Sequence, residues 1–529
     1  MTNSAAEDTD RAEEAAEAAG GTAPDVIPVP EQRPALREVV VDLAFKPAGA
    51  TRALLDDFLS EPSWGIGLRL WFGGGAALEP PFRRTRILHA VDRDIAWLDA
   101  LLTEQVNAIL HHPRFQKLEA SWRGVHYLVA QAEIGEEIKV KVLNMTWPEV
   151  CRDIDRAIEF DQSQLFGKIY SEEFGTPGGE PFGVMIGDYE VQHRRTADHP
   201  TDDLAALKGI SGVAAAAFCP FIVGSSPALL GLDSFTDLGI PVDLRAVFGQ
   251  LEHARWRSFR ETEDSRFVGI TLPRVLMRFA YRDDGSRIDG FRFQETVEDR
   301  RRADYLWGNA AYAFGALLMR AFNQTAWFTE IRGTPQDMLS GGIVDSLPVE
   351  WFKTDKQGIA IRYSTDVSIS EFQERDLAEL GFMPLCKVKN TDYSAFYSNQ
   401  SAQSAKSYTT VVASVNARLS AMLQYILSVS RFAHFIKVIG RDRVGSFATP
   451  EECERYLQAW IRTYCIGSDS PSPETRARYP LRDGKVKVHE LPGRPGNYAC
   501  TIHLQPHFQS DEIVSAFKLV TELAPRSAA

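Results

Sequence analysis

The chain has 529 residues, of which 44% are hydrophobic and 10% aromatic, so it is long enough for several well-packed structural units. Its formal net charge of −13 argues against a general nucleic-acid-binding protein and against adsorption to an anionic membrane surface, since both need a basic face. The six cysteines are scattered without a Cys-x-x-Cys pair, and the acidic N-terminus lacks the apolar core of a secretory signal. These features predict reduced thiols and a cytoplasmic location.

The start of the chain predicts an extension rather than a folded domain. Residues 1–34 are acidic, rich in alanine and contain several prolines, so we expect a disordered tail. Within residues 35–88, the segment from Thr51 to Leu59 is predicted to form a short amphipathic helix. A loop containing Gly73-Gly74-Gly75 and Pro80-Pro81 then separates this helix from the rest of the chain.

A long helix is predicted next, from about Ala90 to His111, and Pro113 ends it. Its apolar residues recur close to every 3.5 positions and form a narrow seam: Val91, Ile95, Leu98, Leu102 and Ile109. Such a seam suits a single partner helix, which could lie in the same chain or in another subunit. The stretch from His111 to Gly124, HHPRFQKLEASWRG, is expected to join this helix to a short helix and then a strand.

Residues 89–350 as a whole have an α/β pattern. Ile138 to Val142 alternate as in a strand with one exposed face, and Phe182 to Gly187 are continuously apolar as in a buried parallel strand. Helices are predicted between these strands, near 147–159, 201–217 and 300–323. The uncharged stretch 209–232 is long enough to cross a bilayer, but its prolines and glycines favour a buried helix, a short strand and a loop.

Residues 351–529 predict long helices followed by strands. The longest helix is expected from Ser407 to Ile439. Its buried side is marked by Val411, Val415, Leu419, Met422, Ile426 and Phe432. Another helix starts at Thr449-Pro450-Glu451-Glu452, which has the residues of a capping box. After a loop rich in proline and arginine, a strand is predicted over Tyr498 to Leu504, and a further strand or short helix over Ile513 to Leu523.

No phosphate-binding, dinucleotide-binding or nucleophile motif occurs, so we expect no enzyme activity, no cofactor and no metal. Cys500, His503 and His507 are the only close group of possible zinc ligands, and on a strand the two histidines would lie roughly 13 Å apart, too far to share one ion. One segment does gather charged residues of both signs: Arg257, Arg260, Glu261, Glu263, Asp264 and Arg266. We interpret this segment as a structural ion-pair network, with a hydrolase site built on its carboxylates as the alternative.

Several motifs, in order along the chain, resemble the large subunit of the type VI secretion contractile sheath, the TssC/VipB/ImpC/EvpB family. The first is HHPRFQKLEASWRG from His111 to Gly124. The others lie within residues 179–189, 226–235, 256–269, 305–309, 392–396, 480–482 and 495–498. Together they span about four-fifths of the chain, from near residue 90 to near residue 510.

The resemblance implies a structural protein with an α/β (in part α+β) fold, in which mixed sheets are flanked by helices. It implies pairing with a small sheath subunit (TssB/VipA-like) and helical polymerisation of many copies around an Hcp-like inner tube. Contraction of that lattice would propel the tube and spike, which implies contact with a baseplate. A ClpV-like AAA+ unfoldase would then dismantle the spent sheath in the bacterial cytoplasm.

Two segments are similar to functional parts of the family. The first resembles the short N-terminal helix that the unfoldase recognises: Leu54, Leu55, Asp56, Asp57, Phe58 and Leu59. Packing of this helix on its own domain is the alternative. The second is a candidate inter-subunit strand, marked by Tyr498, Cys500, Ile502 and Leu504, although an internal strand fits it equally well. The long N-terminal extension and the end of the chain, Asp511 to Glu522, depart from the best-known large subunits. These departures leave open an accessory sheath paralogue that does not form the main lattice.

Overall fold

The computed structural model describes residues 49–72, 84–132, 138–176, 178–286, 290–297, 302–334, 340–353, 360–443, 449–467, 472–490, 498–507 and 517–523. The chain divides into two compact units: Met1–Gln105 with Ser286–Phe293, and Val106–Gly285 with Gln294–Ala529. The tail predicted over residues 1–34 lies outside the described residues. The boundary predicted near residue 88 falls inside one helix, α5 (Arg84–Leu110), and no division occurs near residue 350.

The described part of the first unit contains the helices α3 (Gly49–Ser60), α4 (Trp64–Phe72) and most of α5. The helix α3 matches the predicted amphipathic helix. The helix α4 was not predicted, because Gly65 and Gly67 interrupt its apolar sequence. Gly67 nevertheless suits this position, since it faces the ring of Phe58, which packs on Trp71 with ring centroids 5.5 Å apart. The indole nitrogen of Trp71 donates to the buried carboxylate of Asp94 on α5 at 2.8 Å, which ties α4 to α5.

The segment after α5 forms one long helix where a short helix and then a strand were expected. After Leu110 the chain turns, and Pro113 occupies the first turn of α6 (Pro113–Gln131), which His112 caps by accepting from the backbone N–H of Arg114. The prediction of a short helix followed by a strand was wrong, because α6 continues for 19 residues. Its β-branched and aromatic residues after Gly124 favour a strand locally. Packing of Val125 and Leu128 into the core overrides that preference.

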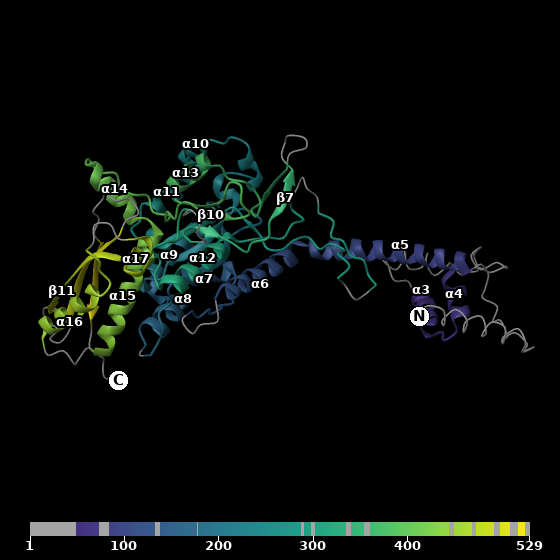
Figure 1. Ribbon diagram of the computed structural model, residues 1–529, viewed down its shortest axis with the longest axis horizontal. Helices are drawn as coiled ribbons and strands as arrows, with labels where there is room; N and C mark the ends of the chain where they lie inside the picture. The colour runs from purple at the N-terminus through teal and green to yellow at the C-terminus, as the bar shows by residue number, and fades with distance from the viewer. Residues whose placement is uncertain are drawn as a thin grey trace, which may run out of the picture. The chain divides into compact units, whose positions relative to one another are not determined.

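A six-stranded mixed sheet forms the centre of the second unit, in the order β1-β2-β3-β9-β10-β6 (Figure 1). The first four strands run parallel, and β10 pairs antiparallel with both β9 and β6. Their bounds are β1 Met185–Val191, β2 Phe221–Ser225, β3 Val268–Leu272, β6 Ile343–Val344, β9 Met383–Lys387 and β10 Ser394–Phe396. This arrangement confirms the predicted α/β class. The predicted parallel strand at Phe182–Gly187 is present but starts three residues later, as the terminal strand β1.

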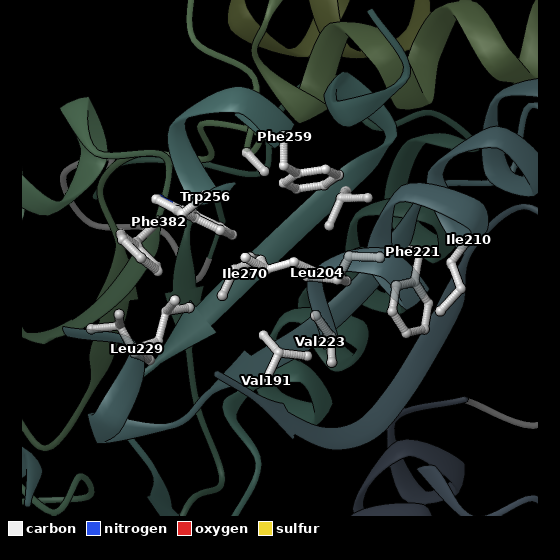
Figure 2. Close-up of a cluster of buried hydrophobic side chains, with 14 of the residues drawn as sticks. Val191, Leu204, Ile210, Phe221, Val223, Leu229, Trp256, Phe259, Ile270 and Phe382 are labelled. Carbon is white, nitrogen blue, oxygen red and sulfur yellow. The ribbon is translucent and has the colours of Figure 1, made fainter. Parts of the chain in front are cut away.

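Helices cover both faces of this sheet, because alternate residues of its strands point into two separate cores. Phe221, Val223 and Ile270 lie in the core shared with α9 (Asp203–Ala217), whereas Ile222 lies in the core shared with α6 and α12 (Ala310–Thr325). Figure 2 shows the first core, in which Trp256 stacks on Phe382 with ring centroids 5.7 Å apart. Further helices of the second unit are α7 Trp147–Arg156, α8 Gln164–Phe166, α10 Leu244–Gly249, α11 Ala254–Arg260 and α13 Glu371–Glu379.

The structure shows what the stretches 209–232 and 138–146 form. The uncharged stretch 209–232 forms the end of α9, the strand β2 and a short 3-10 turn at Pro227–Leu230, as predicted. Among the described residues, no helix combines the length and hydropathy needed to cross a bilayer. Residues 138–146 belong to no strand, so the strand predicted over Ile138–Val142 lacks a ladder partner within the described part of the chain.

The C-terminal region differs from the prediction in two places. The single helix expected over Ser407–Ile439 is two helices, α14 (Val411–Ser420) and α15 (Leu423–Arg443). They separate where Met422 forms a β-bridge with Gln400, and Val411 is 78% exposed instead of buried. Beyond α16 (Pro450–Arg462), the predicted loop contains a helix, α17 (Pro473–Arg478), and a ten-residue strand, β11 (Leu481–Glu490).

A three-stranded antiparallel sheet, β11-β12-β13, ends the chain and packs on α15 and α16. Its remaining strands are β12 (Tyr498–Pro506) and β13 (Phe517–Leu523). The last segment, which was predicted as a strand or a short helix, therefore contains a strand. Thr449 caps α16 by accepting from the backbone N–H of Glu452, as its sequence predicts. Two short ribbons complete the fold: β4 Val275–Leu276 with β5 Trp307–Gly308, and β7 Glu350–Lys353 with β8 Ala360–Tyr363.

Candidate assembly interface

The motif from His111 to Gly124 fixes α6 to the second unit through a buried ion network. The guanidinium of Arg278 donates from Nε to Glu119 at 2.8 Å and from Nη1 to Glu295 at 2.5 Å. Glu119 also accepts from Nε of Arg123 at 2.8 Å, and Glu295 lies 3.2 Å from Nε2 of His111. Burial alone would raise the pKa of Glu295, but the hydrogen bonds from Arg278 and the backbone of the chain hold it below its usual value.

The same motif contacts Asp188 on β1, which belongs to the second motif, residues 179–189. The hydroxyl of Ser121 donates to the Asp188 carboxylate, which also shares a hydrogen bond with Tyr312 on α12. Burial raises the pKa of Asp188 above its usual value. Gly124 allows this close approach of α6 to α12, since a Cβ there would lie 2.3 Å from the ring of Tyr312. The motif residues therefore pack and pair, and none of them forms a catalytic arrangement.

Other residues of α5 and α6 leave apolar surface exposed. On the α5 seam, Ile95 is 49%, Leu102 is 46% and Ile109 is 58% exposed, while Val91 and Leu98 are half-buried. On α6, Leu118 and Trp122 are 55% and 68% exposed. The exposed residues repeat at a spacing of seven on α5 and of four on α6, as in helices that pack on another helix. The α5 seam as a subunit contact stays a prediction.

In the described part of the chain, the C-terminal sheet has an unpaired edge at β13 and not at the strand that the sequence indicated. β12 is the central strand and pairs with β11 on one side and β13 on the other. Cys500, Ile502 and Leu504 are fully buried in the core beneath the sheet. Tyr498 pairs with Glu490 of β11 and Leu523 of β13 at the end of the strand. The outer edge of β11 is covered by α16, because the backbone N–H groups of Val486 and Val488 donate to the side chains of Gln458 and Glu454. Among the described residues, the unpaired edge of this sheet therefore belongs to β13.

The sequence matches two domains of one family over most of its length. Residues 92–403 match the family described as EvpB/VC_A0108, tail sheath N-terminal domain, and residues 412–523 match the tail sheath gpW/gp25-like domain of the same family. The type VI secretion system sheath protein TssC1 of Pseudomonas aeruginosa is 40% identical over 439 residues, covering 82% of this chain and 86% of that protein. The chain belongs to the family of type VI secretion sheath large subunits. As a member of that family it is a structural sheath protein and not an enzyme.

A chain in a solved structure of the anti-feeding prophage baseplate, determined by cryo-electron microscopy, has a TM-score of 0.33 and 8% identity to this sheath protein. The alignment covers 72% of this chain and 82% of that one. This likeness is too low to define a shared fold.

The mixed-charge segment of this sheath protein is structural, although its arginines act differently from the prediction. Arg257 donates to the backbone carbonyls of Phe248 and Gln250. Arg260 is buried and donates to the carbonyl oxygens of Ala402 at 3.0 Å and Glu379 at 2.9 Å, and its burial lowers the pKa of its guanidinium to about 10. Two of the three arginines therefore hold loops in place through backbone carbonyls.

Only part of this segment pairs as an ion network. Glu263 pairs with Arg266 and with Nζ of Lys406, the latter at 2.9 Å. Glu261 is exposed, and partial burial raises the pKa of Asp264. None of these three carboxylates lines the groove of about 1850 Å³ in the second unit.

The predicted unfoldase helix has one packed face and one exposed face. Phe58 packs on α4, and Leu54 and Leu55 are half-buried. Leu59 is 71% exposed, and Asp56 and Asp57 are exposed beside it. This helix can therefore pack on its own unit with one face and present a binding surface with the other.

The cysteines and histidines of the described residues form no metal site. All six cysteines are free, and Cys500 is completely buried while His503 on the same strand is exposed on the other face. Among the described residues, no group of three His, Cys, Asp or Glu side chains could hold an ion. The burial of Cys219 and Cys386 raises the pKa of each thiol well above its usual value, so both stay protonated and unreactive.

Proposed function

We propose that this protein is a lattice-forming large subunit of the type VI contractile sheath, and that its α5 seam binds a helix of the small sheath subunit. The observation that carries the proposal is the exposure of Ile95, Leu102 and Ile109 along one line of a 27-residue helix. A leucine and isoleucine seam of this length is costly to leave in water, since each buried apolar side chain contributes about 1.5–3 kcal/mol. A partner helix would remove it from water.

A neighbouring subunit would pair with the outer edge of β13 in the C-terminal sheet. This edge pairs with no strand in the described part of the chain, so it can accept a strand from another chain. Strand pairing of this kind keeps subunits connected while each one rotates, as contraction requires. In this proposal the residues of β12 support the sheet from its centre, and the shared strand adds outside β13.

The assembled sheath would surround the inner tube, attach to a baseplate and work in the bacterial cytoplasm. After contraction, the exposed face of α3, with Asp56, Asp57 and Leu59, would be recognised by the AAA+ unfoldase. A short amphipathic helix is a suitable ligand for a groove on such a partner.

The seam is tested by co-purification with the small sheath subunit from the same genome. The double variant Ile95→Asp, Leu102→Asp puts two charges on the seam and is expected to reduce the recovered small subunit at least tenfold. The double variant Ala96→Asp, Ala100→Asp puts the same charges at exposed positions of the same helix off the seam, and is expected to leave recovery unchanged. Equal recovery with both variants would contradict the seam as the contact.

A further inference from the structure

The exposed residues of the α5 seam repeat with a strict period of seven. Leu88 is 51% exposed and extends the line of Ile95, Leu102 and Ile109 by one further heptad. An ideal α-helix has about 3.6 residues per turn, so residues seven apart drift slowly around a straight helix. A partner helix can contact all four residues only if the two helices wind around each other in a left-handed supercoil. The seam therefore fits one long helix that has an apolar heptad repeat of its own.

The two flanks of this seam differ. On one flank α4 packs against α5, where the indole nitrogen of Trp71 donates to Asp94 at 2.8 Å. On the other flank lie Asp92 and Asp99, each four residues after a seam residue. In a heptad with the exposed seam residues at position a, both carboxylates occupy position e, beside the flank of a partner helix. Neither carboxylate has a hydrogen bond or an ion pair with another described residue.

We propose that the α5 seam selects its partner by charge, and that the helix of the small sheath subunit that occupies it has lysine or arginine opposite Asp92 and Asp99. The inference rests on the proposed function and adds the chemistry by which the partner helix is recognised. Charged residues at the flanking positions of a coiled coil set partner choice and orientation. A helix without these cations would leave both carboxylates unpaired beside an apolar contact, which disfavours it relative to the basic partner.

A second copy of α5 does not supply these cations. Its flanking positions contain no lysine or arginine, since they are occupied by Asp92, Asp99 and Val106 at position e and by Ile87, Asp94 and Leu101 at position g. Position e of one helix faces position g of a parallel partner or position e of an antiparallel one. Two copies of this helix would therefore place each carboxylate opposite another carboxylate or an apolar side chain. The charges favour a basic partner over self-association.

One polar residue within the seam adds a requirement on register. Gln105 is exposed and lies one heptad after the half-buried Leu98, on the second line of the seam. A single polar residue at a core position of a coiled coil fixes the register of the two helices, because a shifted partner would bury it against apolar side chains. The partner helix is therefore expected to have a polar residue opposite Gln105.

Charge reversal in the full-length chain, co-expressed with the small sheath subunit of the same genome, tests the inference. Asp92→Lys and Asp99→Lys are each expected to reduce recovery of the small subunit about threefold, because an attraction becomes a repulsion of similar size. Glu104→Lys makes the same change of charge at an exposed position of α5 away from the seam, and should leave recovery unchanged. Raising the salt to about 1 M should abolish the difference, since charges are then screened over about 3 Å, whereas a folding defect would not respond in this way. Equal recovery with all three variants would overturn the inference.

A charge swap gives an independent readout. Benzoylphenylalanine in place of Leu102 should crosslink to one helix of the small subunit, in which mass spectrometry identifies the lysine or arginine beside the contact. Changing that residue to glutamate should restore recovery of the Asp99→Lys variant. A crosslinked helix without such a cation, no restoration by the swap, or crosslinks to a second copy of this chain would overturn the inference.

The seam variant Ile95→Asp, Leu102→Asp separates the two proposals. Loss of the small subunit in this variant, without any effect of the lysine substitutions, would overturn the charge selection and leave the proposed function standing. No loss in this variant would overturn the seam contact of the proposed function as well.

Discussion

Replacing Gly124 with valine should destabilise the second unit, because α6 lies against α12 at this residue. A Cβ at Gly124 would lie 2.3 Å from Cε2 and 2.4 Å from Cδ2 of Tyr312, well inside van der Waals contact. The tyrosine ring cannot move aside freely, since it is 5% exposed and its hydroxyl is hydrogen-bonded with Asp188. The clash must therefore be relieved by separating the two helices.

The expected loss is about 2 kcal/mol. Overpacking a core costs about 1–3 kcal/mol, and the fixed ring of Tyr312 puts this site toward the upper end. Valine gains a few tenths of a kcal/mol over glycine in helix propensity, which offsets a small part of the cost. The substitution Gly167→Val is the matched control, because a Cβ at that helical glycine meets no atom within 4 Å.

The assay is urea unfolding of the full-length chain, followed by tryptophan fluorescence. Gly124→Val should lower the midpoint of the transition of the second unit, while Gly167→Val should leave it unchanged or slightly raised. The companion change Tyr312→Leu should recover part of the loss in the Gly124→Val background, because it removes the clashing ring atoms. An unchanged midpoint for Gly124→Val would refute the close packing of α6 on α12.

Three other predictions concern buried charge and an exposed helix. Arg278→Met should cost about 3 kcal/mol of unfolding free energy, because it removes the cation that pairs with the buried carboxylate of Glu295 and the partly buried one of Glu119. Lys168→Met breaks an exposed pair and should cost less than about 1 kcal/mol. Burial raises the pKa of Asp366 to about 7, so the native state should lose stability as the pH rises from about 4 to 7. In Asp366→Asn that loss should disappear from the thermal midpoints measured between pH 5 and pH 8, and an unchanged pH profile would argue against the raised pKa. Leu59→Ala should weaken pull-down of the sheath by the unfoldase without lowering the thermal midpoint, since the side chain is 71% exposed. Phe58→Ala should lower the midpoint, because this ring packs on Trp71. Equal unfoldase binding by wild type and Leu59→Ala would argue against the contact.

The sequence predicted elements well where periodicity alone decides them. The core face of α16, with Cys453, Leu457 and Ile461, and its start at Thr449 follow from i, i+4 spacing and a capping residue. The seam of α5 follows from the same kind of periodicity, and Ile95, Leu102 and Ile109 on it are exposed, but a partner helix for it stays a prediction.

The errors arose where distant residues decide the local structure. The long C-terminal helix divides because Met422 bridges to Gln400, a contact that no local pattern reveals. The strand expected over Ile138–Val142 needs a neighbouring strand, and the described chain supplies none. The ion network around residues 257–266 was only partly correct, since carbonyl acceptors for Arg257 and Arg260 come from other segments and leave no trace in the local sequence.

The central claim, that this chain builds a sheath lattice, is tested most directly by negative-stain electron microscopy of the chain co-expressed with the small sheath subunit of its own genome. Lattice formation predicts hollow tubules that contain both chains. A soluble heterodimer that never forms tubules would contradict the claim and would favour an accessory sheath paralogue.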